Sequence, residues 1–267
     1  MSELAETVQV HLLAAIDNDD LVLPTLPEVA LRIREAAEDV DISVGALGKV
    51  ISRDPALAAR LIKVVNSPML RATQEVTDLS AAINRLGINY SSNLAIGLVI
   101  EQIFHARSPV VQAKLLEVWC QSLEVAGVSY ELCRRHTSLK PDQAALAGLV
   151  HQIGILPILT YAQDHNELLS DPVCLNHVIE RIQPLLGVRI LEAWEFAEPL
   201  AKVPGHYLDL TRHTAQIDYA DIVQIARLVR QRDFHRLPGL PAYRHLNLGE
   251  ELPLAEVDLS VALGMFR

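Results

Sequence analysis

Apolar residues recur along this chain at the three- and four-residue spacing that places them on one face of an α-helix. In the stretch DPALAARLIKVVNSP, residues Leu57, Leu61, Val64 and Val65 form one such stripe. No stretch shows the sustained alternation of apolar and polar residues that is typical of a β-strand, and none carries an Asn-Gly hairpin signal. The pattern therefore predicts an all-α protein.

Capping residues and prolines indicate where the predicted helices begin and end. Side chains of Ser, Thr and Asp accept hydrogen bonds from the first free N–H groups of a helix, and proline suits the first helical position. On this basis Asn66 and Gly87 are expected to end helices, with Asn66 in a left-handed conformation. The predicted starts are a capping box at Thr25 and Glu28, Asp54-Pro55, Thr77, Ser108-Pro109, a start near Pro141, and Asp171-Pro172.

The helical segments group into three parts. We expect an N-terminal helix at residues 1–19 and a multi-helical domain at 20–232, followed by a tail at 233–267. The sequence HARSP predicts a seam near 105–110, which divides the domain into an N-terminal lobe (20–107) and a C-terminal lobe (108–232). The tail is richer in proline and glycine but keeps several leucines, so it is expected to pack back on the body.

Composition and charge narrow the classes of function. Half of the 267 residues are hydrophobic but aromatic residues make up only 4%, so the core must be built from Leu, Ile, Val and Ala. This composition favours helices, because Ala and Leu are strong helix formers. The net charge of −10 disfavours nucleic-acid binding, because an acidic surface repels phosphate backbones. The nearest approach to a basic patch is Arg227, Arg230, Arg232 and Arg236, whose spacing is more typical of a solvated helix face.

Several features indicate a soluble cytoplasmic protein. Cys120, Cys133 and Cys174 show no CxxC spacing, and we expect them to be buried thiols in a reducing compartment. The first ten residues, MSELAETVQV, do not have the pattern of a signal peptide. No uninterrupted apolar run reaches the roughly 18 residues of a membrane span, and the best candidate, 144–159, contains His151, Gln152 and Pro157. We therefore expect no membrane association.

Several motifs together resemble the HDOD domain family. DPALAARLIKVVNSP followed by LSAAINRLG resembles its first half, and LPTLPEVALRI resembles its usual opening. VWCQSLEVA, AALAGLVHQIGILPI and AWEFAEPLAKVPGHY resemble its second half, which is related to the HD phosphohydrolase core. The resemblance covers roughly residues 20–232. It implies an all-helical domain of bacterial signalling proteins, in which the second lobe is similar to an HD phosphohydrolase.

The resemblance also locates the positions where an HD hydrolase holds its metal ions. The family's first histidine, in a Trp-x-His-Ser context, corresponds to Gln121. The His-Asp pair corresponds to His151 and Gln152, and the later His-His pair to Gly205 and His206. A neutral amide cannot offset the charge of a divalent ion as a carboxylate does, so this donor set is degenerate. We expect no catalytic residue, no metal and no cofactor, with Asp221 a further acidic candidate nearby.

Two interpretations of His151 remain open at this point. It is either a core histidine whose imidazole hydrogen bonds to Gln121 or Gln152, or part of a retained pocket that binds a ligand without converting it. The candidate binding residues are Gln121, His151, Gln152, Trp194, His206 and Asn66. Trp119 and Trp194 are expected mainly as core anchors. Asn66-Ser67-Pro68 is expected mainly as a helix end, with partner recognition as the alternative.

These observations predict a non-enzymatic regulatory module that acts through a protein partner. One rival is a metal-dependent phosphohydrolase or phosphodiesterase with atypical ligands. A second rival is a binding protein for a nucleotide second messenger, in which Arg53, Arg60 or Arg85 would contact a phosphate. The sequence leaves the oligomeric state and the identity of the partner open.

Overall fold

In the computed structural model, residues 3–18, 23–67 and 75–246 are described. Every regular element within these residues is helical, which confirms the all-α class. The elements are α1 (Glu3–Asp17), α2 (Glu28–Glu38), α3 (Val44–Ile51), α4 (Pro55–Val65), α5 (Leu79–Leu86), α6 (Ile88–Ile100), η1 (Glu101–Ile103), α7 (Pro109–His136), α8 (Pro141–Val150), α9 (Ile155–Gln163), α10 (Asn166–Ser170), α11 (Pro172–Ala193), α12 (Glu198–Ala201), α13 (Val203–His206), α14 (Tyr219–Arg230), η2 (Phe234–Gly239) and α15 (Pro241–His245).

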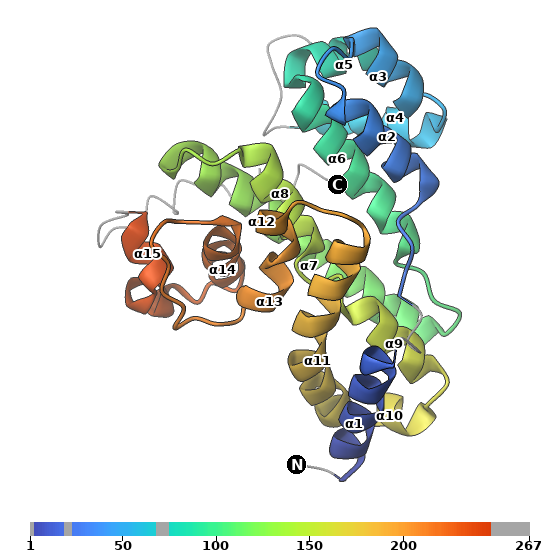
Figure 1. Ribbon diagram of the computed structural model, residues 1–267, viewed down its shortest axis with the longest axis vertical. Coiled ribbons are helices and arrows are strands. Elements are labelled where there is room, and N and C mark those ends of the chain that lie inside the picture. The colour runs from blue at the N-terminus through green and yellow to red at the C-terminus, as the bar shows by residue number, and fades with distance from the viewer. Residues whose placement is uncertain (1–2, 19–22, 68–74, 247–267) are drawn as a thin grey trace.

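Helices α2 to α6 lie together in the upper part of Figure 1, and we refer to them as the N-terminal lobe. Helix α6 is buried from Leu94 to Ile100 because nearly every residue there is apolar. It packs on α2 within its own lobe and on α8 of the next lobe. Close approach to α8 needs a small residue, since a Cβ on Gly97 would lie 2.3 Å from Cδ1 of Leu149. Helix α6 thus joins the two lobes.

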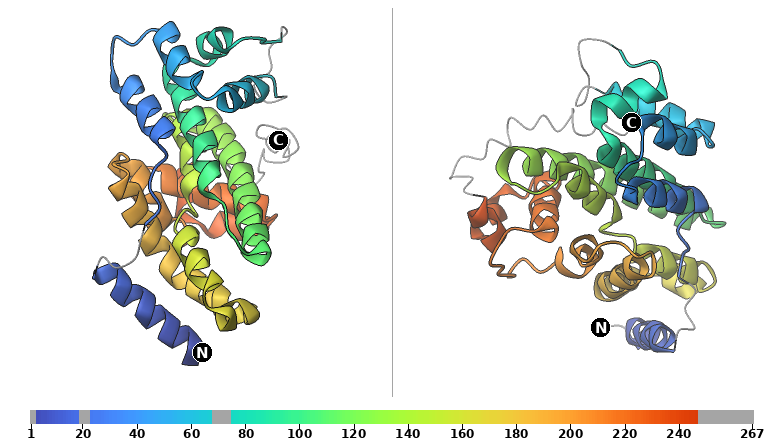
Figure 2. Two further views of the ribbon diagram at one scale, coloured as in Figure 1. Left: turned by 90° about the vertical axis from the view of Figure 1, so that its right-hand side faces the viewer. Right: turned by 45° about the horizontal axis from the view of Figure 1, so that its top comes forward.

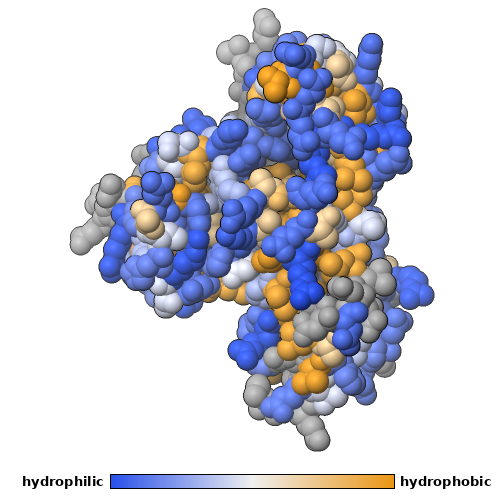
Figure 3. All heavy atoms as spheres, in the orientation of Figure 1, coloured by the Kyte–Doolittle hydropathy of each residue, from blue (hydrophilic) through white to orange (hydrophobic). Residues whose placement is uncertain are grey.

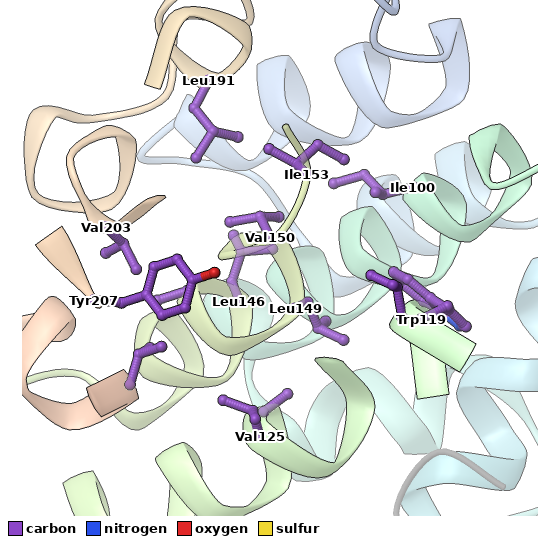
Figure 4. Packing of buried hydrophobic residues seen from close by; sticks show 14 of the residues in the cluster. Ile100, Trp119, Val125, Leu146, Leu149, Val150, Ile153, Leu191, Val203 and Tyr207 are labelled. Atoms are coloured by element: carbon purple, nitrogen blue, oxygen red, sulfur yellow. The ribbon is translucent and has the colours of Figure 1, made fainter. Parts of the chain in front are cut away.

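The C-terminal lobe is built around α7, α8 and α14. Helices α7 and α8 lie in close contact, and a Cβ on Gly148 would lie 2.6 Å from Cα of Ala126. Figure 4 shows the aliphatic packing around this junction, with Val125 of α7 below Leu146, Leu149 and Val150 of α8. The long α7 therefore serves as the support on which the end of α8 is positioned.

Helices α9 to α11 continue the C-terminal lobe, and α1 packs along α11 (Figures 1 and 2). Val8 and Leu12 of α1 are buried, as expected for an amphipathic helix that covers apolar surface. The turn before α9 presses directly on α11, because a Cβ on Gly154 would lie 2.1 Å from the carbonyl oxygen of Gln183. On the face that Figure 3 presents, hydrophilic residues predominate and hydrophobic ones are exposed in strips.

The predicted helix ends were partly right. Asp54 and Asp171 cap α4 and α11 with their side chains, and Gly87 ends α5 at a positive φ of 83°. The two threonine caps were wrong. Position Pro27 precedes α2 without any side-chain cap, and Asp78, next to Thr77, accepts the N–H of Ala81 at 2.8 Å. A carboxylate is as good an N-cap as a hydroxyl, so adjacent Thr and Asp residues could not be separated by sequence.

Two further boundaries differ from the prediction. The stretch from Pro141 is interrupted by a turn at 151–154, so His151 follows α8 rather than lying inside a continuous helix. The sequence predicts one helix from Asp171-Pro172 and a separate helical segment in LEAWEF (191–196), but α11 continues through Pro184 to Ala193 and so includes the first three residues of LEAWEF. Its buried residues on both sides of the proline, including Ile182 and Leu186, explain this, because packing compensates for the missing N–H.

Other predictions are tested by burial. Residues 233–246 pack on α14, with Leu237, Leu240 and Tyr243 buried, as expected for the start of the tail, while the expectation for 247–267 lies outside the described residues. Cys133 and Cys174 are buried, but Cys120 is exposed, contrary to expectation, because it lies on the outer face of α7.

The prediction about apolar runs also needs correction. The stretch Pro141–Gln163, which comprises α8, the turn at 151–154 and α9, is long and apolar enough to cross a membrane by length and composition alone. Its apolar window is 83% buried inside the protein, however, which is typical of a core helix. The stretch is therefore weak evidence for a membrane span.

Candidate functional site: a buried histidine with an amide partner

The imidazole of His151 is fully buried at the end of α8. Its Nδ1 lies 2.7 Å from the carbonyl oxygen of Gly148, one turn earlier in the same helix. That carbonyl is one of the last four of α8, which lack a partner within the helix, so the imidazole satisfies it by donating its N–H. The sequence thus uses a histidine at the helix end to complete local hydrogen bonding inside the core.

The second imidazole nitrogen faces Gln152. Nε2 of His151 lies 3.0 Å from the side-chain Nε2 of Gln152. Because Nδ1 donates to Gly148, Nε2 of the neutral ring is an acceptor, and the amide N–H of Gln152 donates to it. This confirms the expectation that a glutamine supplies the partner of His151, but only for Gln152. Gln121 instead donates to Oε1 of Glu117 at 3.0 Å on the outer side of α7.

The surroundings keep this imidazole neutral. Burial lowers the pKa of His151 to about 3, against the opposing effect of its hydrogen bond to Gly148. The positive charges of Arg227 and Arg230 lower the pKa further. A histidine in this state neither exchanges protons near neutral pH nor carries a charge that a ligand would recognise.

Two residues that the sequence reading missed complete the environment of His151. The ring of Tyr207 meets the imidazole edge to face, with 4.8 Å between the ring centroids. Its hydroxyl donates to Oε1 of Gln183 at 3.0 Å, and Nε2 of Gln183 donates to the backbone oxygen of His151 at 2.8 Å. Burial raises the pKa of the Tyr207 hydroxyl far above its ordinary value. Figure 4 shows Tyr207 next to Val203, with its hydroxyl toward the side of Val150 and Leu146.

The signal for these two residues was weak in the sequence. Gln183 was a polar residue in an apolar helix, and Tyr207 followed the histidine that the family motif singled out. Both are buried in the structure. Together with His151 and Gln152 they form a connected set of hydrogen bonds, which we call the His151 network.

His206 lies at the end of α13 and is half-buried. Its backbone oxygen accepts a hydrogen bond from Nε2 of Gln224 at 3.1 Å, and the same amide nitrogen donates to the backbone oxygen of Asp209 at 2.6 Å. At the position before it, a Cβ on Gly205 would lie 3.0 Å from Cγ2 of Val188. The hydrogen bonds of His151 involve Gly148 and Gln152 but not His206.

Asp221, the further acidic candidate, has a structural role. It is the N3 residue of α14 and forms a capping box with Asp218. One oxygen accepts from Arg212 at 2.8 Å and the other from the hydroxyl of Thr214 at 2.9 Å. Burial raises the pKa of this carboxyl, and the neighbouring Asp218 raises it further. Its oxygens are therefore used by the start of α14.

Two arginines of α14 face the protein rather than solvent, contrary to the prediction of a solvated helix face. Nε of Arg230 donates to Oε2 of Glu124 on α7 at 2.7 Å. The guanidinium of Arg227 lies 6.0 Å from the centre of the Tyr207 ring. Packing of α14 on α7 turns these side chains inward, which periodicity alone did not reveal. They place positive charge beside the His151 network.

The residues present do not fit the metal centre that an HD hydrolase requires. Within the described part of the chain, no group of three or more His, Cys, Asp or Glu side chains could hold a metal ion. Nε2 of His151 already accepts a hydrogen bond from Gln152, and the side chain of Gln121 is bonded to Glu117. Arg227 and Arg230 add positive charge near His151. A cation placed here would be repelled by these arginines and would lack carboxylates to neutralise it.

The remaining candidate residues have structural contacts. Asn66 has φ −87°, so it is not left-handed as predicted. Its amide donates to the backbone oxygen of Val76 at 2.7 Å and accepts the Val76 N–H at 2.9 Å, which closes the loop after α4. Trp194 is buried and donates to the backbone oxygen of Pro24 at 2.8 Å, while Trp119 is buried against Phe104. Both tryptophans are core anchors, as expected.

The comparisons with known proteins identify the family. The HDOD domain family matches residues 23–207. A crystal structure from Shewanella amazonensis, provisionally named a metal-dependent phosphohydrolase, is 28% identical with a TM-score of 0.84 and covers 98% of this chain and 99% of its own. An HDOD domain protein of unknown function from Geobacter sulfurreducens is 20% identical with a TM-score of 0.75, covering 97% of both chains.

Two further relatives have more of their own length outside the match. A protein from Marinobacter aquaeolei, provisionally named a signal transduction protein, is 22% identical with a TM-score of 0.62 and covers 98% of this chain and 66% of its own. An uncharacterized protein from Treponema pallidum is 24% identical over an alignment of 193 residues that covers 67% of this chain and 36% of that protein. This chain thus spans about a third of that relative. The match over 23–207, with the helical fold of the neighbours, shows that this chain belongs to the HDOD domain family.

Proposed function

We propose that this HDOD protein is a non-enzymatic regulatory module of signal transduction that acts by binding a protein partner. The observation that carries the proposal is the state of His151. The histidine that an HD hydrolase uses as a metal ligand is here fully buried, neutral and bonded on both nitrogens. A site whose remaining donor is satisfied by the protein itself stabilises the fold and leaves no open position for substrate.

The substitutions around His151 support a structural use of the former site. Gln152 donates a hydrogen bond from the position where an HD hydrolase has a carboxylate that coordinates metal. Gln183 and Tyr207 link the turn at 151–154 to α11 and α13. Buried polar groups that are fully bonded define one arrangement of the surrounding helices. The surface of the C-terminal lobe is thereby held rigidly, which suits a protein that presents a fixed shape to a partner.

The phosphohydrolase alternative is carried by the provisional name of the Shewanella relative. It requires that Gln121, Gln152 and Gly205 be replaced as ligands by residues elsewhere. The nucleotide alternative depends on free arginines. Arg60 is paired with Glu101, and Arg53 lines a cavity of only 50 Å³, so the described contacts favour neither residue as a phosphate ligand. Nη1 of Arg85 is buried without a hydrogen-bond partner among the described residues, so the nucleotide alternative rests on Arg85.

The test combines metal analysis with partner capture. The purified, untagged protein is measured by elemental analysis before and after incubation with Mn²⁺, Fe²⁺ and Zn²⁺, and is then assayed with a chromogenic phosphodiester. We expect substoichiometric metal and no turnover above the buffer. One or two retained ions per chain together with turnover that is lost in His151→Ala would overturn the proposal.

The positive arm uses chemical cross-linking in a lysate of the source cells, followed by mass spectrometry. We expect one protein to be cross-linked reproducibly, and the same protein to be retained by a column that carries this chain. The control column carries the urea-unfolded chain, which presents the same composition without the fold. Retention that is equal on both columns would show that the interaction does not use the folded module.

A further inference from the structure

A cavity lies between the two lobes, away from the His151 network. Its volume is about 330 Å³, within the size range of small-molecule sites. Figure 1 shows α6, α8 and α12 converging at this place near the centre of the view. The lining comes from α2, α6, the first turns of α8 and the segment 195–200.

Buried aliphatic residues form one part of the cavity wall. Ile96 of α6, Leu146 of α8 and Leu200 of α12 line it and are each less than 5% exposed. Phe196, half-buried and tilted against Trp194, adds an aromatic wall. A ligand that fills this part gains free energy by burying apolar surface.

Polar and charged residues form the rest of the wall. Arg34 is already neutralised, because it donates to the backbone oxygen of Trp194 and pairs with Glu195 at 3.4 Å and Glu38 at 4.0 Å. Lys140 has no partner among the described residues, since no hydrogen bond or ion pair involves its ammonium group. Asp142, two residues later, is bonded to the amide of Asn93 at 2.6 Å and pairs with no cation among residues 3–18, 23–67 and 75–246.

The cavity therefore offers one unpaired positive and one unpaired negative charge close together at the start of α8. Amides complete the recognition surface. Nδ2 of Asn93 is used by Asp142, which leaves its oxygen as an acceptor, and Oε1 of Gln143 accepts from Tyr219 at 2.7 Å, which leaves its amide N–H groups as donors. A ligand that matches carries an anion and a cation near each other, with an apolar body.

We propose that this cavity between the lobes binds a small zwitterion of the α-amino acid class with an apolar side chain. The ligand's carboxylate contacts Lys140 and its ammonium group contacts Asp142, while its side chain lies against Ile96, Leu146 and Leu200. A phosphorylated nucleotide suits the site less well. Its negative charges would face Glu38, Asp142 and Glu195, while Lys140 is the only unpaired cation among the described residues that line the cavity.

The same geometry couples the ligand to both lobes. Asn93 belongs to α6 of the N-terminal lobe, and Asp142 begins α8 of the C-terminal lobe. A ligand that contacts Ile96 of α6 and Leu146 of α8 bridges the two lobes, so it stabilises the folded arrangement by mass action and raises Tm. This inference does not depend on the identity of the protein partner, and its failure would leave the proposed function intact.

The experiment measures binding of defined small molecules to the full chain by calorimetry and by thermal unfolding. The probes are L-leucine and L-phenylalanine. Two analogues each lack one charge: 4-methylpentanoate has no amine and 3-methylbutylamine has no carboxylate. Adenosine and its monophosphate test the nucleotide alternative. We expect saturable binding and a raised Tm with at least one amino acid, and binding at least about tenfold weaker for either analogue, the factor that one charge-assisted hydrogen bond supplies.

Charge-removing variants locate the site. Lys140→Met keeps the aliphatic stem and Asp142→Asn keeps the hydrogen bond to Asn93, so both are expected to fold with a Tm near that of the parent. Each is expected to weaken amino-acid binding at least about tenfold. Lys49→Met and Asp41→Asn, exposed positions outside the cavity, are the matched controls and should bind as the parent does.

Three results would overturn the inference. They are the absence of saturable binding by either amino acid, binding that is unchanged in both cavity variants, and binding of adenosine or its monophosphate where the amino acids fail.

Discussion

The side chains of His151 and Gln152, neighbours in the sequence, are hydrogen bonded to each other, with 3.0 Å between the two Nε2 atoms. The amide is the donor, because Nδ1 of the imidazole donates to Gly148. An aspartate at position 152 would offer only acceptors to the same nitrogen. The exchange of a carboxylate for an amide thus converts a potential pair of metal ligands into an internal hydrogen bond.

Restoring the carboxylate alone should not restore metal binding. We expect Gln152→Asp to retain no more Mn²⁺, Fe²⁺ or Zn²⁺ than the parent in elemental analysis, because Gln121 faces Glu117 and two arginines act on the same region. Gln152→Glu serves as a control for the added charge. A stoichiometric ion in Gln152→Asp but not in Gln152→Glu would show that the remaining donors are competent after all.

His151 should matter for stability. Replacing it by alanine leaves a cavity and removes the partners of Gly148 and Gln152. We expect His151→Ala to lose about 2–5 kcal/mol of unfolding free energy, the range for large-to-small changes in a core. Urea unfolding measures this loss. His105→Ala, at an exposed position, is the control and should change stability by less than about 0.5 kcal/mol. A loss for His151→Ala as small as that of the control would contradict a buried structural role.

The same histidine should make stability depend on pH. Its pKa is about 3 in the folded protein and ordinary, 6.5, when unfolded. Between these pH values the unfolded chain binds about one proton more than the folded protein does. The free energy of unfolding therefore falls as the pH is lowered below 6.5. The slope is at most about 1.4 kcal/mol per pH unit for one proton.

This contribution is measured as a difference between the parent and His151→Gln, by urea unfolding at several pH values between 7 and 4. Asp221, whose pKa burial raises, contributes equally to both proteins and cancels. The parent should lose stability more steeply than the variant as the pH falls. Parallel curves would mean that the imidazole is accessible to protons in the folded state.

Gly154 should tolerate no side chain. A Cβ at this position would lie 2.1 Å from the backbone oxygen of Gln183 and 2.5 Å from the backbone nitrogen of Gly187, and backbone atoms cannot turn aside. We expect Gly154→Ala to lose about 3 kcal/mol or more, the upper end for overpacking. Gly45→Ala is the matched control, since its Cβ would meet nothing nearer than 4.0 Å, and helix propensity predicts a gain of up to about 1 kcal/mol. Equal Tm shifts for the two variants would contradict the close contact of the 151–154 turn with α11.

Local sequence was sufficient for the helices and for much of their punctuation. The apolar stripe of α4, the caps at Asp54 and Asp171 and the stop at Gly87 depend on residues within one or two turns of each other. The resemblance to the HDOD family located the metal-ligand positions, and the residue types at those positions then showed that the donor set is degenerate. These properties are determined by covalent chemistry and short-range backbone geometry, which the sequence states directly.

Tertiary structure alone decided how the polar residues of the core are used. The packing of α7, α8, α11 and α14 determines these contacts. It brings Gln152 rather than Gln121 to His151, and it places Gln183 and Tyr207 against the turn at 151–154. It also turns Arg227 and Arg230 inward. The cavity between the lobes has the same origin, since its charges come from segments more than 100 residues apart. Hydrogen bonds and interactions between buried charges form only between groups that are close in space. For distant segments of the chain, packing of the whole protein rather than any local pattern decides which groups are close.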